Sequence, residues 1–293
     1  MIKLFTDTSA NLPVSVIKQY GIEVVPFSYT VNGKPVPYSA DADFNGRAFY
    51  EAMRAGADVK TSMVNVSDFT AAFEPWLEKG DAVIYIGMSG GISGTANAAK
   101  LAVEDLLGDY PSAKIAAIDT FAASLGEGFL VIEAAKMIEH GEPFLRIVKK
   151  IELARKNMCQ FFTVDDLAYL KKGGRISGAA AVVGTVLNIK PMLKGDETGK
   201  IVLCGKVRGF IKSMDALAEK YDELALDKSA PVGIAHADNP EGAKQLEERL
   251  RAKGFSGEVL NVIYEPVTGA HVGPGTVAAR PPCCASSAAL SSR

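Results

Sequence analysis

The sequence predicts an α/β protein built from two α/β domains. Short apolar runs alternate with stretches of helical spacing, which is typical of βαβ units around a largely parallel sheet. The chain has 293 residues, a length that favours about two domains. The pattern changes near residue 155. We therefore expect a mostly parallel N-terminal sheet with flanking helices over residues 1–155 and a smaller C-terminal α/β domain over residues 156–280.

Turn and capping residues place the first elements. An apolar strand over 2–5 precedes a helix over 13–20, with Pro13 in its first turn and Gly21 just past its end. A second strand over 22–31 closes at the Asn32-Gly33 turn. The other expected N-terminal elements are strands over 82–86 and 114–118 and helices over 44–55, 68–79 (N-cap Ser67), 95 onward, 123–139 and 143–156.

The C-terminal domain is expected to combine strands, a hairpin and helices. Strands over 189–193 and 200–206 flank a glycine-containing turn and form the hairpin. Thr163 and Asp166 resemble a capping box before a short helix. Further strands are expected over 158–162, 231–237 and 258–263, with a helix over 240–253. Residues after Val277 have neither strand nor helix pattern, and we expect 281–293 to be an atypical, disordered tail.

Composition excludes several classes of protein. A net charge of −2 gives no support for nucleic acid or an anionic membrane as the main partner. The most apolar stretch, 178–189, is too short to span a bilayer, and the N-terminus lacks the apolar region of a signal peptide. The four cysteines have neither metal nor disulfide spacing. We therefore expect a cytoplasmic protein without a transmembrane segment.

Two polar stretches lie at predicted strand ends or loops, where open α/β sheets place ligands. Thr61 and Ser62 offer adjacent hydroxyls that can donate to a carboxylate or phosphate, and the alternative is a turn capped by its own side chains. The loop from Gly87 to Thr95 joins a strand to a helix whose N-terminus favours an anion near Ser93. The alternative there is a glycine turn with Ser93 as N-cap.

The same loop contains a formal match to the nucleophile elbow G-x-S-x-G, centred on Ser89. A serine hydrolase would then require an acid and a histidine downstream, which Asp119 or Asp238 and His271 supply in order. An elbow turns directly into its helix, whereas further loop residues intervene here. The hydrolase is therefore the less favoured hypothesis.

Arg175 and His271 are the candidate basic residues. Arg175 stands between glycines and an apolar segment, where a guanidinium needs an anionic or carbonyl partner. His271 opens a glycine- and proline-rich stretch of the kind that presents side chains to ligands, although a structural histidine is the alternative. His140 and His236 complete the histidines, and none has the spacing of a metal site. Without a nucleotide motif either, we expect no metal and no cofactor.

These stretches together resemble the DegV family, and in particular the fatty-acid-binding subunits of bacterial fatty acid kinase. The resemblance runs in family order from the N-terminus to about Val277. Its matching segments are Thr6-Asp7-Thr8-Ser9, Thr61-Ser62, Ile92-Ser93-Gly94-Thr95, Asp119-Thr120, 124–128, 170–177, 188–193 and 271–275.

The resemblance implies a fatty acid bound between two α/β domains. Its carboxylate would meet Thr61, Ser62 and the Ser93-Gly94-Thr95 segment, with His271 nearby, and Arg175 matches a position near the site and the partner-facing surface. A separate kinase subunit would use ATP and magnesium to phosphorylate the carboxylate, and the acyl-phosphate would pass to phospholipid synthesis. The chain itself would be a carrier without catalytic machinery. Another anionic small molecule remains an alternative ligand.

The apolar segment 179–187 is the expected wall of the hydrocarbon slot, where each buried methylene contributes about 0.8 kcal/mol. Three features depart from the family pattern. Met63-Val-Asn stands where Gln-Pro-Ser is frequent, Gly90-Gly91 replaces a bulkier polar loop, and the chain from Ala278 onward lacks the usual final apolar strand. If that strand is absent, a sheet edge is left unpaired.

Overall fold

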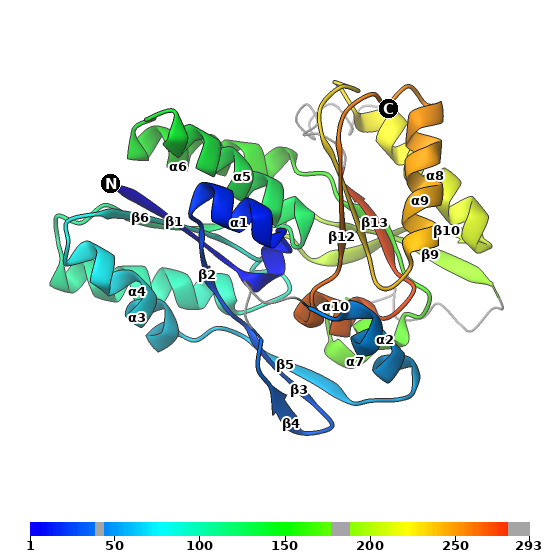
Figure 1. Ribbon diagram of the computed structural model, residues 1–293, viewed down its shortest axis with the longest axis horizontal. Helices are drawn as coiled ribbons and strands as arrows, with labels where there is room; N and C mark the ends of the chain where they lie inside the picture. The colour runs from blue at the N-terminus through cyan, green and yellow to red at the C-terminus, as the bar shows by residue number, and fades with distance from the viewer. Residues whose placement is uncertain (39–43, 177–187, 281–293) are drawn as a thin grey trace. The chain divides into compact units, whose positions relative to one another are not determined.

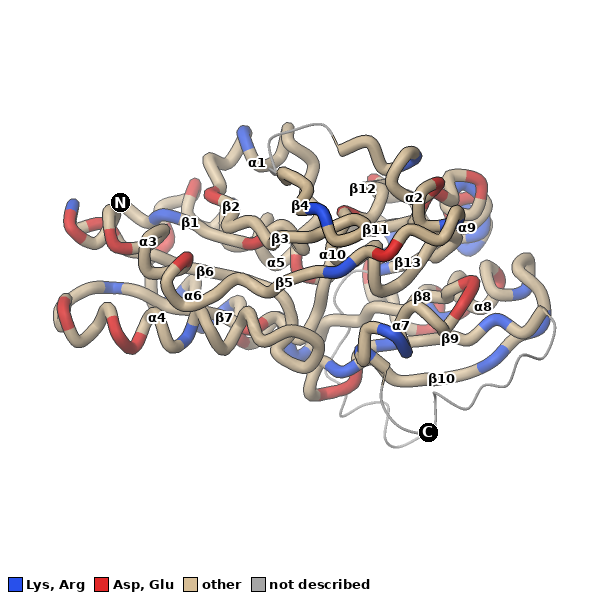
Figure 2. Tube along the Cα trace, turned by 90° about the horizontal axis from the view of Figure 1, so that it is seen from below, with Lys and Arg blue, Asp and Glu red and all other residues tan. Residues whose placement is uncertain are grey.

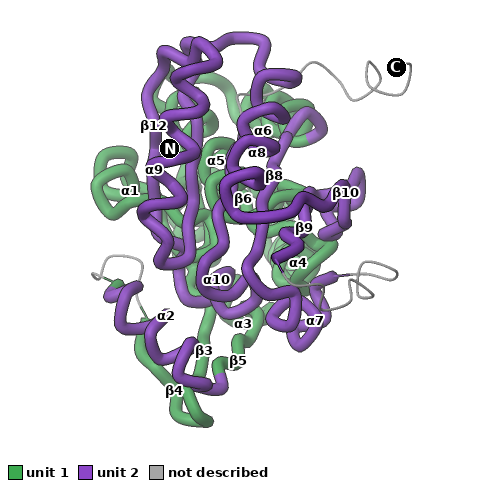
Figure 3. Tube along the Cα trace, turned by 90° about the vertical axis from the view of Figure 1, so that its right-hand side faces the viewer, with its two compact units in different colours: residues 1–44, 59–155 green, residues 45–58, 156–293 purple. Residues whose placement is uncertain are grey.

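The chain forms two compact units, coloured in Figure 3. A computed structural model describes residues 1–38, 44–176 and 188–280. The first unit comprises 1–44 and 59–155, and the second comprises 45–58 and the chain from 156 onward. The segment 45–58 therefore belongs by its contacts to the second unit, although it interrupts the first in sequence. The sequence did not predict this insertion.

The first unit is built on a four-stranded parallel sheet in the order β2-β1-β6-β7. The strands are β1 (Ile2–Asp7), β2 (Glu23–Val25), β6 (Ala82–Gly87) and β7 (Ile115–Asp119). Every residue of β6 is buried, as expected for a central strand of a parallel sheet that is covered on both faces. This architecture confirms the predicted α/β fold class.

Helices cover both faces of this parallel sheet (Figure 1). One face carries α5 (Leu125–Glu139) and α6 (Phe144–Ala154), and the other carries α3 (Val66–Leu77) and α4 (Thr95–Asp109). The carboxyl ends of β1, β6 and β7 meet at one edge because the strands are parallel. The polar segments that follow these strands are thereby gathered at that edge, where open α/β sheets bind ligands.

A small antiparallel sheet in the order β4-β3-β5 completes the first unit, together with α1 (Val14–Tyr20) and a short 3-10 helix at Thr8–Ala10. Its strands are β3 (Ser28–Val31), β4 (Lys34–Val36) and β5 (Val59–Ser62). Asn32 and Gly33 form the predicted turn, with φ of 50° and 76°. The strand expected over 22–31 is instead two strands in different sheets, because Pro26 between them has no N–H for a ladder.

The second unit is built on a six-stranded mixed sheet in the order β10-β9-β8-β13-β11-β12. Only β11 and β12 pair in parallel within the described sheet. Its strands are β8 (Phe161–Thr163), β9 (Ile189–Gly195), β10 (Ile201–Arg208), β11 (Val232–His236), β12 (Val259–Ile263) and β13 (Val277–Arg280). Its helices are α2 (Gly46–Arg54), α7 (Ala168–Gly173), α8 (Phe210–Leu224), α9 (Pro240–Ala252) and α10 (Pro266–Val272). The predicted β9–β10 hairpin is confirmed.

The expectation that the strand pattern stops at Val277 was wrong. Residues 277–280 form β13, which pairs with β11 on one side and β8 on the other. Ala278 and Ala279 are buried, since small apolar side chains suit a central strand covered on both faces. The sheet edge that the missing strand would have exposed is therefore paired. Residues 281–293 lie outside the described part of the chain.

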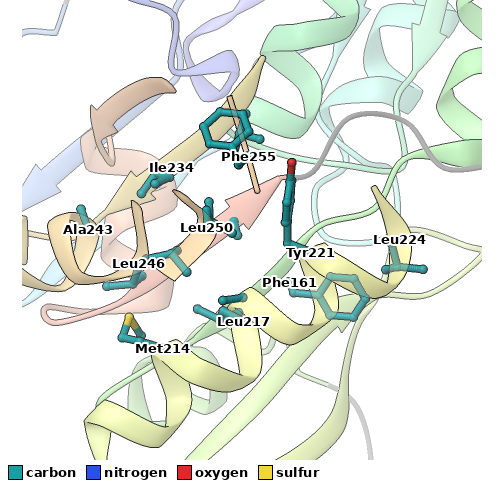
Figure 4. Close-up of a cluster of buried hydrophobic side chains, with 14 of the residues drawn as sticks. Phe161, Met214, Leu217, Tyr221, Leu224, Ile234, Ala243, Leu246, Leu250 and Phe255 are labelled. Atoms are coloured by element: carbon teal, nitrogen blue, oxygen red, sulfur yellow. The ribbon is translucent and has the colours of Figure 1, made fainter. Parts of the chain in front are cut away.

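Helices α8 and α9 pack together over the core of the second unit (Figure 4). Leu217 of α8 and Leu246 of α9 are both fully buried there. Tyr221 and Phe255 meet edge to face, with their ring centroids 5.8 Å apart. Helix α8 was not predicted from the sequence, although its apolar residues recur at helical spacing.

Tyr50 anchors the inserted helix α2 within the second unit. Its side chain is fully buried, and its hydroxyl donates to the backbone oxygen of Tyr264 over 2.8 Å. At the end of the same helix, Arg54 forms an ion pair of 2.5 Å with Asp238. These contacts explain why 45–58 groups with residues far along the chain.

Gly128 of α5 is expected to tolerate no larger residue. A Cβ at this position would lie 2.6 Å from the backbone oxygen of Ala10 and 2.9 Å from Leu12. The Ala10 oxygen is part of the backbone and cannot rotate away, so Gly128→Ala should lower the free energy of unfolding by about 1–3 kcal/mol. Urea denaturation measures this change.

Gly108 of α4 provides the matched control, because it is an exposed helical glycine with open space around its Cβ position. Gly108→Ala should raise the free energy of unfolding by about 0.5 kcal/mol, since alanine restricts the unfolded chain. Equal effects of the two substitutions would contradict the close approach of α5 to Ala10.

Candidate functional site

The loop after β6 is held by hydrogen bonds to the ends of its neighbouring strands. Met88 N donates to Asp7 Oδ2 over 3.1 Å, and Gly90 N donates to Asp119 Oδ2 over 3.1 Å. Ser89 N donates to the backbone oxygen of Ala122 over 2.8 Å. Three segments at the carboxyl edge of the sheet thus fix the path of the glycine-rich loop.

Ser89 faces the interior of this loop. Its side chain is fully buried, and its hydroxyl accepts the N–H of Gly91 over 3.0 Å. Its backbone oxygen accepts the N–H groups of Ile92 and Ser93. A nucleophile elbow instead exposes its serine on a strained turn. The geometry therefore gives the hydrolase hypothesis no support.

The N-terminus of α4 brings together three of the predicted site residues. Ser93 Oγ lies 2.9 Å from Thr95 Oγ1 and accepts the N–H of Thr95 over 3.3 Å. Ser93 is partly exposed, whereas Thr95 is fully buried, and Gly94 is exposed. Two hydroxyls at the start of a 15-residue helix form an arrangement suited to an anion. Ser93 also accepts a local hydrogen bond from Thr95 N. The geometry therefore agrees in part with both hypotheses for Ser93, an anion site and a local helix cap.

Thr61 and Ser62 lie in β5, not in the turn that the sequence suggested. They pair with Tyr29 and Ser28 of β3. Because successive strand residues point to opposite faces, the two hydroxyls do not face the same way along the strand. Met63, which follows them, lies against the loop: a Cβ on Gly94 would come within 2.7 Å of its Sδ. The end of β5 is thereby brought to the start of α4.

Arg175 follows α7 in the second unit. The last turn of this helix contains Lys171 and Lys172, and Gly174 closes it in the left-handed conformation. Figure 2 shows basic residues in blue at α7. Arg175 N donates to the backbone oxygen of Leu170 over 3.0 Å, and its guanidinium donates to the backbone oxygen of Gly173. The partly buried guanidinium is thus held beside the end of the helix.

His271 lies in the last turn of α10, where the sequence had suggested a loop. Gly173 makes room for its ring, since a Cβ at Gly173 would lie 2.3 Å from His271 Nδ1. Burial, and then the positive charge of Arg175, lower the pKa of His271 to about 4. At neutral pH the imidazole is therefore uncharged, and it can donate one hydrogen bond to an anion beside an arginine.

Asp7, Ser9, Tyr85 and Glu127 form a buried polar network beneath the glycine-rich loop, which sequence reasoning missed. Ser9 Oγ contacts Asp7 Oδ1 over 2.5 Å and Glu127 Oε2 over 2.7 Å, and Tyr85 Oη donates to Asp7 Oδ2 over 2.6 Å. Asp7 and Glu127 are 1% and 0% exposed. An acidic residue at the end of an apolar strand and another between helical glycines were the available signals.

Some expectations fall outside what the structure describes. The apolar segment 179–187 and Ser177 lie in a range that it leaves out. Among the described residues, no group of three or more His, Cys, Asp or Glu side chains is placed to hold a metal ion. No helix in the described ranges is both long enough and apolar enough to cross a membrane.

The fold and these polar groups define an α/β protein with a hydroxyl-lined helix N-terminus in one unit and a neutral histidine beside an arginine in the other. The chain belongs to the DegV family, since the family model described as "Uncharacterised protein, DegV family" matches residues 1–280. A DegV domain-containing protein of Clostridium perfringens is 36% identical over 276 residues, covering 94% of this chain and 95% of the relative. The predicted family membership is confirmed.

Solved structures of the family have the same fold. A fatty acid binding DegV family protein of Streptococcus agalactiae matches with a TM-score of 0.85 at 30% identity, covering 96% of this chain and 99% of that one. DegV of Bacillus subtilis, described as a fatty acid binding protein, matches with a TM-score of 0.82 at 30% identity, covering 95% and 98%. A DegV family protein of Thermus thermophilus, described by its fatty acid binding, has a TM-score of 0.84 at 29% identity, covering 96% and 99%.

Proposed function

We propose that this protein binds a long-chain fatty acid and presents its carboxylate to a separate ATP-dependent kinase subunit. The acyl-phosphate so formed would pass to phospholipid synthesis. In this role the chain acts as a carrier and leaves the phosphoryl transfer to its partner. The proposed ligand contacts are Thr61, Ser62, Ser93, Gly94, Thr95, Arg175 and His271.

One observation carries the proposal: His271 and Arg175 both lie at Gly173, which leaves room for the imidazole ring and whose backbone oxygen accepts a hydrogen bond from the guanidinium. A neutral imidazole that donates a hydrogen bond and a fixed guanidinium can both bind a carboxylate, whereas an apolar ligand would leave them without a partner. Ser93 and Thr95 at the N-terminus of α4 offer further donors of the same kind. The fatty acid binding described for the family members of S. agalactiae, B. subtilis and T. thermophilus supports the choice of ligand.

Organic-solvent extraction of the purified protein, followed by mass spectrometry of the released lipid, tests the ligand. We expect about one fatty acid per chain, and rebinding of added fatty acid after delipidation. A protein that carries no lipid and takes up none would contradict the proposal. A fluorophosphonate probe on Ser89 would then test the hydrolase alternative.

The kinase step is tested separately by supplying ATP, magnesium and a fatty acid kinase catalytic subunit and measuring acyl-phosphate formed on the bound acid.

Ser93→Ala is expected to weaken binding of a fatty acid by about tenfold. The substitution removes a partly exposed hydroxyl at the α4 N-terminus, and a hydrogen bond to a charged group contributes about 1.5–3 kcal/mol. Titration of delipidated protein with palmitate measures the effect. Ser89→Ala is the control: its hydroxyl is buried and accepts the N–H of Gly91 within the loop, so stability should fall while affinity changes less. A greater loss of affinity at Ser89 would remove Ser93 from the site.

A further inference from the structure

Helix α10, which carries His271, is too short to hold its own position. It has seven residues, Pro266–Val272, and Gly269 lies at its centre. An isolated helix of this length is unstable in water, and a glycine in its interior weakens it further. The place of the His271 imidazole is therefore set by the side chains that pack against α10.

Glycines of α7 and α10 let these two helices approach each other closely. A Cβ on Gly273, just past the end of α10, would lie 2.3 Å from Tyr169 Cδ2 of α7. A Cβ on Gly173, the last residue of α7, would lie 2.3 Å from His271 Nδ1. The C-terminal end of α10 is thus fitted against α7, where the guanidinium of Arg175 also contacts Gly173.

Tyr50 packs against the other end of α10. Its hydroxyl donates to the backbone oxygen of Tyr264 over 2.8 Å, two residues before the helix begins. A Cβ on Gly269 would lie 2.1 Å from Tyr50 Oη and 2.9 Å from Tyr50 Cζ, so the tyrosine lies directly against the backbone of α10. Tyr50, from the inserted helix α2, is therefore part of the packing that fixes α10 within the second unit.

Ion pairs also connect the inserted segment to the rest of the second unit, but they are exposed. Arg54 pairs with Asp238 and Lys172 pairs with Asp58, and the two basic side chains are 44% and 67% exposed. Exposed ion pairs contribute little to stability, because water and salt screen them. Tyr50, in contrast, is fully buried, so we expect its alteration to displace α10 more than the loss of either ion pair.

We propose that Tyr50 is a positioning residue for His271: it holds α10 so that the imidazole occupies the space that Gly173 leaves at the end of α7. Helix α2 thereby acts on the proposed carboxylate site through α10. A shift of α10 moves the imidazole away from Gly173 and from the charge of Arg175. The consequence for ligand binding rests on the proposed function, whereas the placement of the imidazole does not.

Tyr50→Phe tests this role, because it removes the hydroxyl and keeps the ring. Burial, and then the charge of Arg175, lower the pKa of His271 to about 4, so a displaced imidazole should titrate closer to 6.5. We expect Tyr50→Phe to raise the pKa of His271 by about one unit. We also expect its affinity for palmitate to fall about fivefold. NMR of protein labelled at histidine measures the first effect, and calorimetric titration measures the second.

Tyr221→Phe is the matched control. Tyr221 is also buried in the second unit, but its hydroxyl has no hydrogen-bond partner among the residues that the structure describes. This substitution should leave the pKa of His271 and the affinity for palmitate unchanged. If the pKa of His271 in Tyr50→Phe also equals the wild-type value, Tyr50 has a structural role only and the proposal is overturned, whatever the Tm of the variant.

A substitution on the opposite side of the contact gives an independent test. Gly269→Ala places its Cβ against Tyr50 Oη and should raise the pKa of His271 in the same direction. In the double variant the nearest ring atom is Cζ, at 2.9 Å, so Tyr50→Phe should restore part of the Tm that Gly269→Ala loses. Additive losses of Tm would overturn the contact on which the proposal depends.

The proposed function and the placement of the imidazole can fail separately. If the wild-type protein does not bind palmitate, the proposed function fails, while the pKa of His271 in the Tyr50 and Gly269 variants still decides whether Tyr50 positions the imidazole.

Discussion

Replacing palmitate with decanoate is expected to weaken binding by more than a thousandfold. The replacement removes six methylene groups, and each buried methylene contributes about 0.8 kcal/mol, which gives about 5 kcal/mol in total. The hydrocarbon chain, not the head group, should therefore supply most of the affinity. Calorimetric titration of the delipidated protein with a series of saturated acids measures the slope.

The methyl ester of palmitate is the matched control for this series. It keeps the chain but removes the charge of the head group, so we expect a loss of only about tenfold. Equal affinities across the acid series would mean that the chain is not buried. A thousandfold loss for the ester would mean that the head group dominates, which favours a different anionic ligand.

Acidification from pH 6.5 to pH 4 is expected to cost the delipidated protein about 3 kcal/mol of stability through His271 alone. The pKa of this imidazole falls from 6.5 to about 4 on folding, because of burial and of Arg175. Between those pH values His271 is protonated in the unfolded chain but not in the folded chain, so the free energy of unfolding decreases as the pH falls. Above pH 6.5 this contribution to stability is fully present. Urea denaturation at a series of pH values measures the slope.

Carboxylates also titrate in this range, so the informative quantity is the difference in the free energy of unfolding between wild type and His271→Gln. That difference should change by about 3 kcal/mol over the interval. His140→Gln serves as the control for loss of an imidazole, because His140 is exposed after α5. Parallel pH profiles for wild type and His271→Gln would show that the ring is not held beside Arg175 in the way described.

Local signals in the sequence predicted much of the fold. Pro13 and Gly21 bracket α1, and the Asn32-Gly33 turn joins β3 to β4, as expected from their conformational preferences. Apolar runs identified β6 and β7 because these strands are buried in a parallel sheet. In each case the deciding interaction lies within a few residues of the signal.

Other predictions failed because a different local signal set the boundary of the element. Asn65, not Ser67, caps α3, because Asn65 forms a reciprocal capping box with Asp68. Helix α10 was read as a loop on account of its glycines, yet Glu265 accepts the N–H groups of Val267 and Thr268 and starts a helix. Thr163 lies in β8 and not in a capping box.

The candidate site was predictable as residue types but not as an arrangement. The Ser93-Gly94-Thr95 segment was placed correctly at a helix N-terminus, since a glycine loop after an apolar strand indicates this local geometry. The approach of His271 to Gly173 joins residues about a hundred positions apart, and no local pattern encodes it. Ser9 and Glu127 lie 118 positions apart, so their contact too could be found only in the structure.

The place of β13 in its sheet has a consequence for biosynthesis. The last described strand of the chain lies between β8 and β11, so the middle of the sheet is the part that the ribosome makes last. Until residues 277–280 leave the exit tunnel, β8 and β11 each have an open edge, and the second unit cannot complete its folding. Premature termination a few codons upstream of β13 would therefore split this sheet in two. Loss of an edge strand, in contrast, would leave the rest of the sheet paired.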